Sequence, residues 1–96
     1  MSFSAPFRPP SPAPGSVTHW PSHGIYAQDE HLILRAETFV RSVYRFGEGL
    51  VLTGIYIGPR KIWACFAPVE SPTDNQAAVT LDRASFDRWE AEQEDR

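Results

Sequence analysis

The sequence predicts a small α+β domain in which two helices accompany an antiparallel three-stranded sheet. Three observations lead to this fold class. The chain of 96 residues is 42% hydrophobic, which is enough for one small core and too much for a wholly disordered chain. A β-branched, apolar run with a turn in its middle predicts a hairpin over residues 50–66. The segments about 30–46 and about 83–93, on either side of the hairpin, have helical periodicity.

Residues 1–24 are rich in proline, and we expect them to form an extended or disordered arm. Six of the nine prolines lie in this quarter of the chain, and proline has no backbone N–H to give to a helix or a sheet. The arm also carries Phe3, Phe7 and Trp20, which are costly in a tail unless they pack on something. The globular α+β domain is therefore expected to span residues 25–96.

The segment 29–46 supports two interpretations. As a helix over about 30–46, it collects its apolar residues in one arc, and only Leu34 falls among the polar ones. Asp29 would then cap the start and Gly47 would stop the helix. As a strand over 38–46, its even-numbered residues would form one inner face, and the fold would be a mainly β meander or small barrel. The length of the run without a turn signal favours the helix.

The hairpin consists of residues 50–57 and 62–66, joined by the turn Gly58-Pro59-Arg60-Lys61. Its two faces are both apolar, whereas a sheet with one wet face alternates apolar and polar residues. By strict alternation, one face carries Leu50, Leu52 and Tyr56, and the other carries Val51, Ile55 and Ile57. We therefore expect a helix to cover one face, and the arm, a second subunit or a partner to cover the other.

The last third of the chain completes the expected domain. Residues 67–76 contain the turn formers of a loop, and residues 77–81 form a short third strand. Asp82 is a suitable N-cap for a closing helix, in which Phe86 and Trp89 lie three residues apart and face inward.

Charge and composition indicate in which cellular compartment the protein is expected. The net charge is −3, with an excess of two positive charges in residues 1–61 and of five negative charges in residues 62–96. The sequence has no run of roughly 18 apolar residues and no secretory signal, and its single cysteine excludes a disulfide framework, so we expect a cytoplasmic protein. Eight arginines against one lysine are typical of a GC-rich genome, bacterial or phage.

The sequence offers little for catalysis, and we expect neither an enzyme nor a cofactor or metal site. Cys65 lies in the middle of a strand between apolar neighbours, which is typical of a core thiol. His19, His23 and His31 have no carboxylate or cysteine at a metal-binding spacing. A small enzyme remains an alternative that no motif supports.

The leading functional interpretation is a non-enzymatic protein–protein interaction module, such as a small accessory, adaptor or inhibitor subunit. Its partner would be a larger protein or a second copy of the chain, held on the excess apolar area of the hairpin. The expected protein-binding residues are Tyr56, Ile62, Trp63, Trp20 and Phe7.

Nucleic-acid binding is the alternative interpretation. The order helix, three strands, helix is similar to that of double-stranded RNA-binding domains, which contact phosphates and duplex shape. The resemblance lies in element order alone, since the lysine cluster that opens the family's second helix is replaced here by Asp82-Arg83-Ala84-Ser85. The basic face would comprise Arg35, Arg41, Arg45, Arg60 and Lys61.

Overall fold

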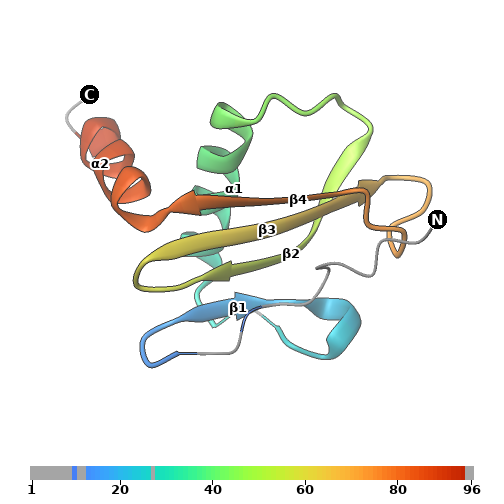
Figure 1. The fold of residues 1–96 in the computed structure, drawn as a ribbon, viewed down its shortest axis with the longest axis horizontal. Helices are drawn as coiled ribbons and strands as arrows, with labels where there is room; N and C mark the ends of the chain where they lie inside the picture. Colours follow the sequence, from blue (N-terminus) through green and yellow to red (C-terminus); the bar gives the residue numbers. More distant parts are fainter. Residues whose placement is uncertain (1–9, 11–12, 27, 95–96) are drawn as a thin grey trace.

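A computed structural model describes residues 10, 13–26 and 28–94 of the chain. It is an α+β fold with a four-stranded antiparallel sheet in the order β1-β2-β3-β4 and two α-helices packed on one face (Figure 1). The elements are β1 (Val17–His19), a 3₁₀ turn η1 (Pro21–His23), α1 (Glu30–Val43), β2 (Leu50–Ile57), β3 (Lys61–Pro68), β4 (Ala77–Asp82) and α2 (Arg83–Glu94). The α+β class is confirmed, but the sheet has four strands rather than the predicted three.

The fourth strand comes from the segment predicted to be an arm. Residues Val17–His19 pair antiparallel with β2, and Trp20 directly after them is only 1% exposed. The chain then turns back through η1, where Gly24 has a φ of 76° and Trp20 pairs with Ile25. A proline at the start of this turn is compatible with the strand, because the strand has ended by then. Phe3 and Phe7 lie outside the described residues.

The segment that supported two interpretations forms the helix α1, so the helix prediction is confirmed and the alternative strand over 38–46 is wrong. Asp29 caps it, since its Oδ1 accepts a hydrogen bond from the Leu32 N–H at 3.1 Å. The helix ends at Val43, three residues earlier than predicted, and Tyr44 has extended backbone angles. The extended backbone lets Phe46 reach the sheet, where its ring lies 4.4 Å from that of Phe66.

Strands β2 and β3 form the predicted hairpin, but the predicted assignment of its faces is wrong. The register shifts between Leu52 and Gly54, so Thr53 sits in a β-bulge. The bulge places residues before and after it on the same face, under the helices. The side chains on that face, all packed in or against the main core, are Leu50, Leu52, Ile55 and Ile57.

Strand β4 and helix α2 lie where the sequence predicts them, and α2 follows β4 without a loop. Phe86 of α2 is fully buried in the main core, and the Trp89 ring lies 5.6 Å from that of Phe39 in α1. Arg35 of α1 and Glu90 of α2 form an ion pair near the surface. Both helices are thus fixed to each other as well as to the sheet.

Candidate functional site

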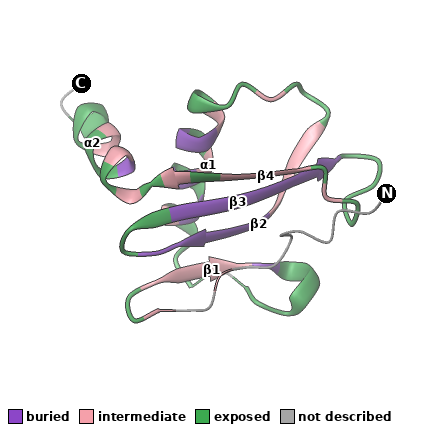
Figure 2. Ribbon diagram, in the orientation of Figure 1, coloured by how far each residue is buried: buried purple, intermediate pink, exposed green. Residues whose placement is uncertain are grey.

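The aromatic residues predicted to bind a partner lie inside the molecule. A second core cluster on the face of the sheet away from the helices contains Trp20, Tyr56, Trp63 and Cys65. Tyr56 and Trp63 are 5% and 7% exposed, and Figure 2 shows that most of β3 and the second half of β2 are buried. Ile62 is fully buried in the main core beneath the helices. Four of the five residues are therefore interior, and Phe7 lies outside the described residues.

This second cluster is held together by tight packing. The indole rings of Trp20 and Trp63 stack with centroids 5.1 Å apart. Cys65 beside them is fully buried, and burial raises the pKa of its thiol from 9.0 to about 12. A thiol that keeps its proton at neutral pH is a poor nucleophile, so the cluster is suited to packing rather than to thiol chemistry.

The histidines do not form a metal site within the part of the chain that the structure describes. His19 lies in β1, His23 in η1 and His31 in α1. No group of three or more histidine, cysteine, aspartate or glutamate side chains able to hold a metal ion occurs among the described residues.

The basic residues of the nucleic-acid alternative lie at two ends of the hairpin. Arg41 donates a hydrogen bond to the Leu50 carbonyl at the start of β2, whereas Arg60 lies in the turn between β2 and β3 and Lys61 begins β3. An eight-residue strand spans roughly 26 Å at ~3.3 Å per residue. Arg41 and Arg35 are also paired with Glu37 and Glu90, so their charges are partly neutralised. Arg45 lies beyond the end of α1 and is exposed.

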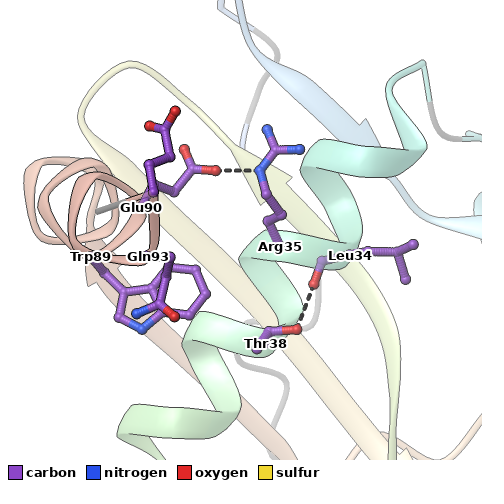
Figure 3. A pocket seen from close by; sticks show the side chains of 7 residues that line it. Leu34, Arg35, Thr38, Trp89, Glu90 and Gln93 are labelled. Carbon is purple, nitrogen blue, oxygen red and sulfur yellow. Dashed lines mark hydrogen bonds and ion pairs between the residues drawn. The ribbon is translucent and has the colours of Figure 1, made fainter. Parts of the chain in front are cut away.

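A groove with a volume of about 680 Å³ lies between α1 and α2. We call it the α1–α2 groove. Trp89 and Gln93 of α2 face Thr38 of α1 across it, and the Arg35–Glu90 ion pair closes one end (Figure 3). The Thr38 hydroxyl donates to the Leu34 carbonyl at 2.9 Å, so this polar group is already satisfied. The groove thus presents a half-buried indole between polar and charged side chains.

Leu34 forms one shoulder of the groove and points away from α2 (Figure 3). Leu34 lies on the polar face of α1 and is 60% exposed. A second hollow of about 260 Å³, lined by His19, Glu30, Ile33 and Leu34, lies on its other side. Leu34 is therefore an exposed apolar ridge between two hollows.

The two hollows are acidic at their rims. Glu90 and Glu94 line the α1–α2 groove and Glu30 lines the second hollow, whereas Arg35 is the one cation among the lining residues that the structure describes. Because Arg35 is paired with Glu90, the rim carries an excess of negative charge. This arrangement can bind a ligand that combines apolar and cationic groups.

The sequence contains a signal for this surface that the prediction did not use. Leu34 is the one residue that breaks the amphipathic pattern of α1, and an apolar residue on a polar helix face marks either a contact with another molecule or a single exposed side chain. The hollows beside it depend on how α1 packs against β1 and against α2, and α2 is distant from α1 in the sequence.

Comparison of the chain with protein-family models, with curated proteins and with solved structures gives no match. In the described part of the chain, no helix has the length and apolar character required to cross a bilayer.

Proposed function

We propose that this chain is a non-catalytic protein-interaction module that docks a partner on the Leu34 ridge and the α1–α2 groove. The observation that carries the proposal is the 60% exposure of Leu34 between two hollows. An apolar side chain flanked by concave surface is the usual form of a docking anchor, because a partner can bury both at once. The hairpin aromatic residues then stabilise the fold instead of touching the partner.

The chemistry of the rim supports a particular kind of partner. Three carboxylates, those of Glu30, Glu90 and Glu94, surround the ridge and groove. Opposite charges across an interface guide encounter and fix register, whereas a carboxylate-rich partner would be repelled. We propose that the docked segment presents apolar side chains to Leu34 and lysine or arginine side chains to the rim, as an amphipathic helix or extended peptide does.

Two synthetic amphipathic helical peptides test this surface. They share the same leucine face, and their polar face is lysine in one and glutamate in the other. Titration into the ¹⁵N-labelled chain should give saturable shifts for Leu34, Thr38 and Gln93 with the lysine peptide alone. Leu34→Ser should weaken that binding about tenfold or more, because burying a leucine is worth about 1.5–3 kcal/mol.

Two matched variants complete the experiment. Val69 is 58% exposed in the loop between β3 and β4, so Val69→Ser removes an equally exposed apolar side chain elsewhere. Glu94→Lys should weaken the lysine peptide, whereas Glu48→Lys, in the exposed turn before β2, should not. Shifts that map to another surface, or equal losses in Leu34→Ser and Val69→Ser, would contradict the proposal.

A further inference from the structure

Strand β4 forms one edge of the sheet, and its outer side has no strand beside it in the described structure. The ladder fixes which of its amides point outward. The Arg83 N–H donates to the Arg60 carbonyl at 2.9 Å, and antiparallel ladder bonds recur at every second residue. The odd-numbered residues of β4 therefore bond to β3, and the N–H and C=O groups of Ala78, Thr80 and Asp82 point away from it.

The two edges of the sheet are protected to different degrees. At the other edge, β1 has three residues and is followed at once by Trp20 and Pro21, so little of it is open to a further strand. Short edges and prolines are the usual protection against edge-to-edge pairing. Strand β4 has six residues, Ala77–Asp82, without a proline, a lysine or a bulge, and only its last residue is charged. It is a regular, nearly uncharged edge.

We propose that β4 pairs antiparallel with β4 of a second copy, with Thr80 opposite Thr80 at the two-fold axis. In this register the outward amides of Ala78 and Asp82 meet one another across the interface. Val79 lies opposite Leu81 on the helix side, and threonine meets threonine on the other side, which are favourable cross-strand pairs. The carboxylate of Asp82 faces Ala78 rather than its own copy, so no like charges lie opposite each other.

The self-complementary register is the reason for choosing a second copy as the occupant. In an isologous contact, if one residue of the first copy meets a second residue of the other copy, the reverse pair also forms. Strand β4 satisfies this condition without placing like charges opposite each other. The resulting sheet would run continuously through both copies, and the exposed Thr80 would become central. The inference does not depend on the proposed docking of a partner on Leu34.

Sedimentation velocity of the full chain over a range of concentrations tests the pairing. The wild type should shift from 10.8 kDa to twice that mass as concentration rises. Thr80→Pro removes only an outward amide and should leave a folded monomer, whereas Thr80→Val keeps the amide and should still dimerise. The amides of Ala78, Thr80 and Asp82 should gain protection from hydrogen exchange in the dimer.

A charge-swap pair keeps the test decisive if Thr80→Pro does not fold. Thr80→Lys and Thr80→Glu should each be at least several-fold weaker dimers, because two like charges meet at the axis. An equimolar mixture of the two should restore the dimer as a heterodimer. A wild type that stays at 10.8 kDa at every concentration, or a dimer that is equally strong in all four variants, would overturn the proposal.

Discussion

The indole ring of Trp20 lies directly against the backbone of Gly54. A Cβ at position 54 would lie 1.8 Å from Cε3 of this ring, much closer than atoms in contact can approach. Gly54 directly follows the bulge at Thr53, so the irregular part of β2 provides the space in which Trp20 sits. The glycine and the tryptophan, 34 positions apart in the sequence, thus form one packing unit across β1 and β2.

We expect Gly54→Ala to lower the free energy of unfolding by about 1–3 kcal/mol, because the added methyl group must displace the buried indole. Urea denaturation followed by tryptophan fluorescence measures this loss. Gly47→Ala is the matched control, since a Cβ there meets nothing within 4 Å, and it should change stability by less than about 0.5 kcal/mol. Equal effects of the two substitutions would show that Trp20 does not occupy this space.

Removal of residues 1–24 should destabilise the domain strongly, although their composition suggests a dispensable arm. The deletion removes β1 and Trp20, whose indole is 1% exposed. Trp20→Ala alone should cost about 3–5 kcal/mol, the usual loss for a buried tryptophan, and Trp20→Phe should cost less because a ring still stacks on Trp63. Thermal unfolding of the three variants checks this order. A deletion that melts at the wild-type temperature would refute it.

The sequence predicts those parts of the fold that local chemistry determines. The turn at Gly58-Pro59, the Asp29 cap and the inward Phe86 all depend on neighbours within a few residues, and the structure has each of them. The bulge at Thr53 is different. The Thr53 hydroxyl lies within hydrogen-bond distance of the Cys65 carbonyl and the Asn75 side chain, which are distant in the sequence, so alternation within β2 does not reveal it.

Strand β1 could not be predicted from the proline-rich sequence around it, because it too depends on a distant part of the chain. A three-residue strand has almost no periodicity of its own, and its place at the edge of the sheet depends on β2 beside it. Trp20 was the available signal, since a large aromatic residue is costly in a free tail. The candidate site was less predictable, because the α1–α2 groove exists only where two helices from opposite ends of the domain meet.

The buried thiol of Cys65 should make stability depend on pH in the alkaline range. Its pKa rises to about 12 in the folded chain from an ordinary value of 9.0, so the folded state retains a proton that the unfolded state loses above pH 9. Stability therefore falls as pH rises from 9 toward 12, by up to about 1.4 kcal/mol per pH unit. Urea denaturation between pH 8 and pH 11 measures this slope.

Cys65→Ala is the control for that measurement, because the variant lacks the titrating group. Its stability should be lower than that of the wild type at pH 8, and the difference between the two should shrink as pH rises. The native thiol should also resist alkylation at pH 8 until the chain unfolds. A constant difference across the range would mean that burial does not raise the pKa of this thiol.

We expect Arg41 to contribute to the stability of the fold rather than to nucleic-acid binding. Its guanidinium pairs with Glu37 at 3.0 Å, donates to the Leu50 carbonyl at 3.3 Å and lies 5.3 Å from the centre of the Phe66 ring. We expect Arg41→Glu to destabilise the chain by about 1–2 kcal/mol through loss of these partly exposed contacts.

Charge reversal at exposed Arg45 and Lys61 is the cleaner probe of nucleic-acid binding, since it should leave stability within about 0.5 kcal/mol of the wild type. Because these residues and Arg41 lie at two ends of the hairpin, we expect no shift of duplex RNA or DNA by the wild type at low salt. Binding that falls steeply with salt, and that Arg45→Glu and Lys61→Glu each abolish without unfolding, would instead establish the alternative function. If Arg41→Glu alone abolished nucleic-acid binding, the loss would be explained by the lower stability of that variant.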